Sequence, residues 1–162
     1  MISGVLLTGP VGVGKTAVSV EVAEMVDDVA VLDLDWLGWF RPPGPLSPDD
    51  LITRNLALVW PTFREAGARR LVLGRALIGP DRLDALRRSV PDVELAVVRL
   101  TAPGEVLERR LRGRDAGATL AGHLAEREAW REDGLDVPSV PTQGRSVREV
   151  AEAVLAEVGW LG

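Results

Sequence analysis

The chain has 162 residues, of which 46% are hydrophobic, and its formal net charge is -5. This length and apolar content predict one domain, residues 1–162, large enough to bury about 70% of the surface that the unfolded chain would expose. The acidic balance argues against a general nucleic-acid binder, the apolar runs are too short to span a membrane, and the lack of cysteine excludes disulfides and makes a reducing cytoplasm the expected compartment.

The amino-terminal segment carries a phosphate-binding motif. Residues 2–8 have the pattern of a short apolar strand, residues 9–16 read GPVGVGKT, and residues 17–26 continue with helical periodicity. Glycines let such a loop curl so that its N–H groups point at phosphate oxygens, and the helix that follows directs its positive dipole end at the same anion. We expect backbone contacts to phosphate from Gly9, Val11, Gly12, Val13 and Gly14.

Two side chains at the end of the motif predict its ligands. Lys15 is the only lysine of the chain, and in such a loop its ammonium bridges the β and γ phosphates of a nucleotide. The Thr16 hydroxyl is expected to ligate Mg²⁺. The motif therefore predicts ATP and Mg²⁺ as cofactors, and a glycine-rich turn that binds nothing is the alternative.

Two aspartates follow at the end of the second predicted strand, residues 29–34. Asp33 and Asp35 are two residues apart, so on a strand they would share a face and project together at the carboxyl edge of the sheet, where α/β ligands bind. We expect Asp33 to support Mg²⁺ and Asp35 to accept the proton of an acceptor hydroxyl. The alternative for one of them is a turn or helix-capping role.

Residues 36–67 are expected to bind the phosphoryl acceptor. Trp36 and Trp39 come directly after the aspartates, and burial in the core is the alternative for both, whereas Trp60 is assigned to the core. Within this segment, Ser47-Pro48-Asp49-Asp50 predicts the start of a helix that runs to about residue 66. Arginines that could bind an anionic or hydroxyl-rich acceptor are Arg41, Arg54 and Arg75.

The remaining pattern predicts an α/β fold. Helical segments separate five apolar strands, and nearly continuous apolar strands are typical of a parallel sheet that is buried on both faces. Ser146-Val147-Arg148-Glu149 reads as a capping box for the last helix, and Thr119 is expected to cap a helix over residues 120–131. The strands are expected at residues 5–8, 29–34, 70–73, 93–100 and 135–140.

The loop at residues 9–16, the two aspartates and the arginine-rich segment 108–115 together resemble small P-loop kinases of the shikimate, gluconate and adenylylsulfate kinase type. The resemblance implies a three-layer P-loop NTPase fold with a five-stranded parallel sheet of order 2-3-1-4-5, and a lid over residues 112–119. It also implies that Arg110 packs near the adenine, that Arg114 reaches phosphate from the lid, and that residues 141–145, Gln143 among them, border the adenine.

The arginine assignments have alternatives. Arg109 or Arg112 could take the place of Arg114, and Glu108 with Arg112 is also an i,i+4 pair of the kind that decorates an exposed helix. One departure from the resemblance concerns the acceptor, because the glycine-rich triplet that shikimate kinases carry after the third strand is missing. His123, the only histidine, is expected to have a surface or packing role.

These observations favour an ATP-dependent kinase that moves the γ-phosphoryl group to a small-molecule hydroxyl or phosphate, with Lys15, Asp35 and Arg114 as catalytic residues. The alternative is an ATP-binding regulatory protein with slow hydrolysis and no small-molecule acceptor. Phosphorylation of a nucleic-acid end is a third possibility, which the acidic balance disfavours.

Overall fold

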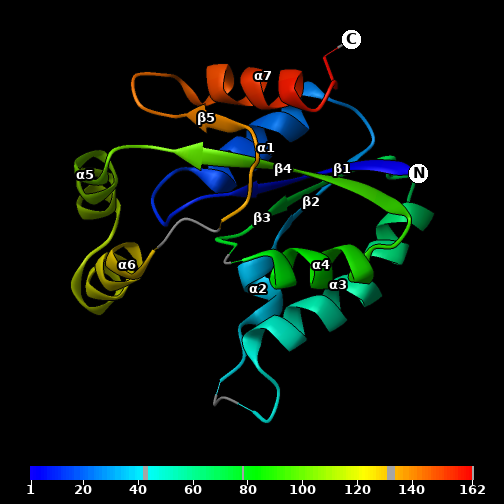
Figure 1. Ribbon diagram of the computed structural model, residues 1–162, viewed down its shortest axis with the longest axis horizontal. Coiled ribbons are helices and arrows are strands. Elements are labelled where there is room, and N and C mark those ends of the chain that lie inside the picture. Colours follow the sequence, from blue (N-terminus) through cyan, green and yellow to red (C-terminus); the bar gives the residue numbers. More distant parts are fainter. Residues whose placement is uncertain (42–43, 78, 131–133, 162) are drawn as a thin grey trace.

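The computed structural model describes residues 1–41, 44–77, 79–130 and 134–161 (Figure 1). Within these ranges five strands form one sheet in the order β2-β3-β1-β4-β5, and all of its pairings are parallel. This confirms the predicted α/β class and strand order. The strands are β1 (Ile2–Thr8), β2 (Val29–Asp33), β3 (Arg70–Gly74), β4 (Val93–Thr101) and β5 (Ser139–Pro141).

Helices cover both faces of the sheet, because the central strand carries apolar side chains on both of its faces. In β1, Val5 and Leu7 belong to one buried cluster and Leu6 to the other, and all three side chains are fully buried. The first cluster lies under α1 (Lys15–Met25) and α7 (Val147–Glu157). Figure 1 shows these two helices together on one side of the sheet.

The opposite face is covered by three helices that follow the second and third strands. These are α2 (Leu34–Gly38), α3 (Pro48–Glu65) and α4 (Pro80–Ser89). Trp60 of α3 is 2% exposed, and its Nε1 donates a hydrogen bond to Asp92 Oδ1 at 3.1 Å, so its predicted core position is confirmed. In Figure 1, α5 (Gly104–Arg114) and α6 (Gly117–Ala129) lie beyond the carboxyl end of β4.

Two predicted helix starts are confirmed by their hydrogen bonds. The Ser47 hydroxyl accepts from the backbone N–H of Asp50 at the start of α3, where proline occupies the first turn. At the start of α7, Ser146 and Glu149 form both halves of the capping box. These caps fix where the two helices begin relative to the sheet edge.

Two predicted boundaries are wrong. Helix α6 begins at Gly117, with Ala116 as its N-cap residue, so Thr119 lies inside the helix and does not cap it; the predicted end at residue 131 falls outside the described residues. The last strand was expected over residues 135–140, but only Ser139–Pro141 pairs with β4. Leu135 and Val137 pack against the core outside the β-ladder. Their apolar pattern therefore reflects contact with the core and not pairing with β4.

No helix in the described part of the chain combines the length and the apolar character that crossing a lipid bilayer requires.

Candidate active site

The loop between β1 and α1 has the backbone shape that its glycines predict. Gly9 has a φ of 137°, and a Cβ at this position would lie 2.4 Å from the carbonyl oxygen of Leu100, so both backbone strain and space exclude a side chain. Gly14 has a φ of 109° and is the N-cap residue of α1, with no side-chain hydrogen bond at the cap. The first N–H groups of α1 are therefore available to an anion.

The Lys15 ammonium lies inside the curl of the loop. Its Nζ donates hydrogen bonds to the carbonyl oxygens of Gly9 at 2.8 Å and Pro10 at 3.0 Å. Burial lowers the pKa of Lys15, while the negative charges of Asp35, Glu126 and Asp33 act in the opposite direction. The ammonium thus faces the acids of the site from the floor of the phosphate loop.

Thr16 and Asp33 place two oxygen ligands side by side. The Thr16 hydroxyl donates to Asp33 Oδ2 at 3.0 Å, and Asp33 Oδ1 accepts from the backbone N–H of Asp35 at 3.2 Å. A hydroxyl and a carboxylate at the rim of a phosphate loop suit Mg²⁺, which proteins usually hold with one or two carboxylates together with phosphates and water. Among the described residues, no cluster of three or more His, Cys, Asp or Glu side chains could hold a metal ion.

The prediction that Asp33 and Asp35 share a strand face is wrong. Asp33 ends β2 and caps α2, and Asp35 lies in the first turn of that helix. The chain turns into a helix here because the Asp33 side chain satisfies a free N–H group of the first turn. The capping alternative therefore holds for Asp33, although both carboxylates still line the same cavities.

Two cavities meet at these aspartates. One of about 660 Å³ contains the phosphate loop with Lys15 and Thr16, and the other of about 510 Å³ contains Trp36, Trp39 and Arg75. The residues that line both cavities are Asp33, Asp35, Arg114 and His123. A group bound in the second cavity therefore lies beside the phosphate loop, with the Asp35 carboxylate in the wall between them.

The environment of Asp35 disfavours its ionised form. The carboxyl is accessible from solvent, yet the cavity walls withdraw it from bulk water, and this partial burial together with the charge of Asp33 raises its pKa. The charges of Arg75 and Lys15 act against this effect and Glu126 adds to it. A carboxylate with increased proton affinity is suited to accepting a proton.

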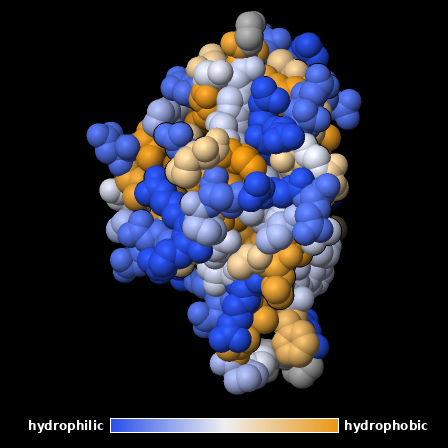
Figure 2. Space-filling model, turned by 90° about the vertical axis from the view of Figure 1, so that its right-hand side faces the viewer, coloured by the Kyte–Doolittle hydropathy of each residue, from blue (hydrophilic) through white to orange (hydrophobic). Residues whose placement is uncertain are grey.

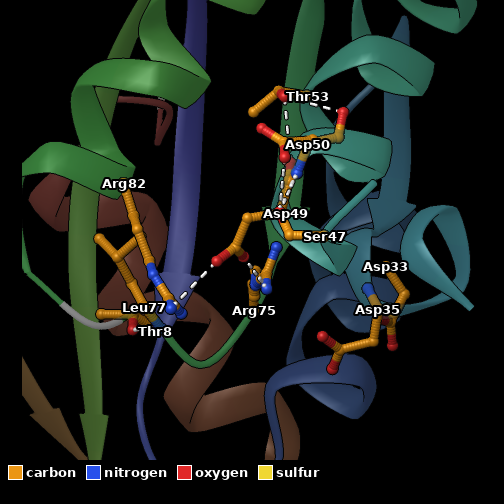
Figure 3. Close-up of polar contacts among 10 residues, drawn as sticks. All are labelled: Thr8, Asp33, Asp35, Ser47, Asp49, Asp50, Thr53, Arg75, Leu77 and Arg82. Atoms are coloured by element: carbon orange, nitrogen blue, oxygen red, sulfur yellow. Dashed lines mark hydrogen bonds and ion pairs between the residues drawn. The ribbon is translucent and has the colours of Figure 1, made fainter. Parts of the chain in front are cut away.

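Arg75 is held in the second cavity by a carboxylate that was predicted only as a helix-start acid. Asp49, in the first turn of α3, forms an ion pair with Arg75 at 2.5 Å and a second one with Arg82 at 3.0 Å. Figure 3 shows Asp49 between the two guanidinium groups, with Asp35 on the other side of Arg75. The Arg75 side chain is only 13% exposed, and its ion pair with Asp49 holds the guanidinium in this position.

The predicted lid segment, residues 112–119, spans the end of α5 and the start of α6. Arg114 forms a two-pronged pair with Asp115, with both nitrogen–oxygen distances 2.9 Å, and His123 Nδ1 lies 2.8 Å from Asp115 Oδ2. Hydrogen bonds from Arg114 and His123 lower the pKa of Asp115 to about 2. These three side chains tie the end of α5 to α6, and Arg114 and His123 line both cavities, so the contact gives His123 a packing role of the kind expected for it.

Arg110 joins the phosphate loop to the segment after β5. Its guanidinium donates to the Val13 carbonyl at 3.3 Å, to Thr142 Oγ1 at 2.9 Å and to the Thr142 carbonyl at 3.1 Å. A third cavity of about 220 Å³ on this side of the loop is lined by Arg110, Thr142 and Arg145. Gln143 is exposed and does not line this cavity, although Thr142 before it in the chain does.

The structure does not bring every predicted binding residue to the site. Arg54 is exposed on α3 and lines none of the three cavities. Arg112 pairs with Glu108 at 2.7 Å on the surface of α5, as its alternative predicted. Trp36 and Trp39 are 68% and 63% exposed, so they are not core residues.

Sequence reasoning missed the contributions of Asp49 and His123 to the site. Asp49 carries a helix-start signal that masks its pairing with Arg75, which follows 26 residues later in the chain. Asp115 lies in the connection after α5 and His123 lies in α6, so their contact depends on how the chain turns between the two helices, which the sequence does not show. Only the chain's single histidine beside the predicted lid gave a usable signal.

Solved structures of small P-loop kinases share this fold over nearly the whole chain. A gluconokinase from Sinorhizobium meliloti aligns with a TM-score of 0.66 and 23% identity, covering 98% of this chain and 93% of that one. The Mycobacterium tuberculosis APS kinase, solved in complex with AMPPNP and APS, aligns with a TM-score of 0.64 and 22% identity over 97% of both chains.

A third similar structure is the tunicamycin resistance protein of Deinococcus radiodurans. It aligns with a TM-score of 0.66 and 23% identity, covering 98% of this chain and 96% of that one. No protein-family model matches the chain, and no curated protein sequence matches it. The comparisons therefore establish a fold shared with small-molecule P-loop kinases.

Proposed function

We propose that this protein is an ATP-dependent phosphotransferase that moves the γ-phosphoryl group of ATP to a small-molecule acceptor. One observation carries the proposal: the cavity of the phosphate loop and a second, aromatic-lined cavity share a wall that contains Asp35. An acceptor in the second cavity would lie in reach of both the terminal phosphate and a proton-accepting carboxylate. The kinase structures with this fold support the reaction class.

In this proposal the nucleotide spans the phosphate loop. The backbone N–H groups of Gly9, Val11, Gly12, Val13 and Gly14 and the N-terminus of α1 bind its phosphates. The 220 Å³ cavity beside Arg110 and Thr142 receives the adenine. Gln143, which follows Thr142 in the chain, would border the adenine from outside this cavity. Thr16 and Asp33 would hold Mg²⁺, which neutralises phosphate charge when bound.

The residues of the shared wall carry the chemistry in this proposal. Asp35 accepts the proton of the acceptor hydroxyl, and its raised pKa favours this role. Lys15 and Arg114 stabilise the charge on the transferred phosphoryl group. Residues 36–67 supply the acceptor cavity through Trp36 and Trp39, and Arg75 extends it from the residue after β3. Residues 112–119 form the lid.

The second cavity favours a kinase over the regulatory alternative. A protein that only binds and slowly hydrolyses ATP needs a phosphate loop and a partner surface, but it needs no hollow beside the γ-phosphate. Here a space of about 510 Å³ opens next to Asp35, and volumes of this size are typical of small-molecule sites.

The loop can be tested with Lys15→Ala. Wild-type protein should be stabilised against heat by AMPPNP with Mg²⁺, and the variant should bind AMPPNP roughly 10–150-fold more weakly, because it loses charge-assisted hydrogen bonds worth about 1.5–3 kcal/mol. Arg54→Ala, which removes an exposed cation outside the cavities, is the matched control and should bind normally. Equal AMPPNP affinity in all three proteins would refute the nucleotide site.

The transfer itself can be tested by screening acceptors for ADP release. An acceptor should stimulate release from wild-type protein and leave as a phosphorylated product detectable by mass. Slow release that no acceptor stimulates, together with a protein partner captured only in the ATP-bound state, would favour the regulatory alternative.

A further inference from the structure

The two arginines that line the second cavity already have carboxylate partners. Arg75 pairs with Asp49, and Arg114 pairs with Asp115 through both nitrogens. An anionic group on an acceptor would have to share these guanidinium groups with carboxylates that already neutralise part of their charge. Among the described residues that line this cavity, Asp33 and Asp35 add two further carboxylates.

The balance of charge therefore disfavours a second anion beside the γ-phosphate. Asp33 and Asp35 both line the inner wall of this cavity, so a further negative charge beside their carboxylates is unfavourable. Glu126 contributes another negative charge from α6. A carboxylate or phosphate on the acceptor would meet the same penalty.

The outer part of the cavity is aromatic and apolar. Trp36 and Trp39 lie with ring centroids 4.8 Å apart and planes tilted by 48°, and Pro48 and Ile52 complete this side. Both indoles remain more than 60% exposed although they are large apolar groups. Ring surfaces of this kind bind flat apolar groups by stacking and by burial of area.

Gly38 allows α2 and α3 to pack closely on this side of the cavity. A Cβ at this position would lie 2.8 Å from Ile52 Cγ1 and 2.9 Å from the Pro48 carbonyl, so only glycine lets the end of α2 approach the start of α3. The apolar character continues past the cavity, since Phe40 is also 58% exposed. Apolar side chains gather near the lower end of the molecule in Figure 2, the end at which Figure 1 places the connection between α2 and α3.

We propose that the acceptor is an uncharged alcohol that carries a flat apolar or aromatic ring. The ring lies against Trp36 and Trp39, and the hydroxyl reaches Asp35 at the inner end of the cavity. This inference rests on the proposed phosphotransferase function and narrows its acceptor. It differs from the anionic or hydroxyl-rich acceptor that the arginines of the sequence suggested. Arg75 already forms an ion pair with Asp49, and Arg54 does not line the cavity.

Matched probes separate ring from charge. Phenyl β-glucoside has a phenyl ring and no charge, phenyl β-glucuronide adds a carboxylate, and methyl β-glucoside lacks the phenyl ring. Uridine and UMP form a second pair of one neutral and one anionic compound. Each is titrated into protein loaded with AMPPNP and Mg²⁺, and binding is read from tryptophan fluorescence and calorimetry. We expect the neutral ring compounds to bind at least tenfold more tightly than their anionic partners, which corresponds to about 1.4 kcal/mol.

Two variants connect the preference to named residues. Trp39→Leu should weaken phenyl β-glucoside about tenfold and leave methyl β-glucoside unchanged. Asp49→Asn should free Arg75 and strengthen the glucuronide about tenfold, which reduces or reverses the preference. Arg54→Gln, on the same helix as Asp49 but outside the cavity, should change neither.

Failure of this inference is distinguishable from failure of the proposed function. If AMPPNP binds and depends on Lys15 but the anionic probes bind more tightly, or no neutral ring compound binds at millimolar concentration, the acceptor class is wrong and the kinase proposal stands. If AMPPNP does not bind at all, the proposed function fails first. An unchanged probe preference in Asp49→Asn would also overturn the inference.

Discussion

Replacing Asp35 by asparagine removes one proton-accepting oxygen from the wall between the two cavities and keeps the size of the side chain. A general base contributes about 10²–10⁴-fold to a rate, so turnover should fall by this factor, which corresponds to roughly 2.7–5.4 kcal/mol of activation free energy. ATP affinity should stay within a few fold, because Lys15, Thr16 and Asp33 keep their positions.

The same substitution should stabilise the protein. The raised pKa of Asp35 means that its ionised form is disfavoured by folding, so its ionisation costs stability as the pH rises through the folded-state pKa, and stability returns as the pH falls below it. The neutral amide removes this cost at pH 7. Since the side chain is accessible to solvent, the gain is limited to about 1 kcal/mol or less, or up to roughly 2–4 °C in Tm.

The assay combines ADP release in the presence of an acceptor with thermal denaturation, each with and without AMPPNP and Mg²⁺. Asp84→Asn is the control, since Asp84 is 59% exposed and its carboxylate lies 3.8 Å from Arg87 on α4, outside the cavities. The control should change neither turnover nor Tm by a measurable amount. Equal losses of ATP affinity and turnover in Asp35→Asn, or a lower Tm, would refute the assigned role.

Three further predictions concern the surroundings of the site. Arg110→Ala removes three hydrogen bonds and should cost about 1.5–3 kcal/mol in urea denaturation, whereas the exposed Arg109→Ala should cost almost nothing. Trp60→Phe should cost about 1–3 kcal/mol by the same measurement, because it leaves Asp92 without its indole partner. With the pKa of Asp115 lowered to about 2, its contacts should be complete above the ordinary carboxyl pKa of about 3.9 and lost as the pH falls toward 2. Hydrogen exchange of α6 should report that loss, and Asp115→Asn should abolish its pH dependence; a wild-type profile without this change would contradict the prediction.

The parts of the fold that were predictable are those with local signals. Local signals include the glycines of the phosphate loop, the Ser47 cap and the capping box at Ser146. Each affects backbone structure only a few residues away, so it can be recognised directly in the sequence. The strand order came from the resemblance to small P-loop kinases and is confirmed. The last strand was misplaced because Leu135 packs partly buried against the core outside the β-ladder, and an apolar pattern does not distinguish core packing from strand pairing.

The candidate site was only partly predictable, because its pairings are long-range. Asp33 and Asp35 were found, but the turn into α2 depends on a side-chain cap that an apolar strand pattern does not show. The pairing of Asp49 with Arg75 joins two segments that only the folded sheet brings together. For the same reason, sequence could not tell that Arg54 faces solvent while Arg75 faces the cavity.

The position of the Lys15 ammonium has a consequence for the speed of recognition. Because two carbonyl oxygens of the loop already hold it, the curled backbone is supported from within before a triphosphate arrives. When a triphosphate binds, the Lys15 ammonium would exchange these carbonyl oxygens for phosphate oxygens, and no disordered segment would have to become ordered. Such a preorganised cradle loses little conformational entropy on binding, so ordering of the loop should not limit the rate of nucleotide entry.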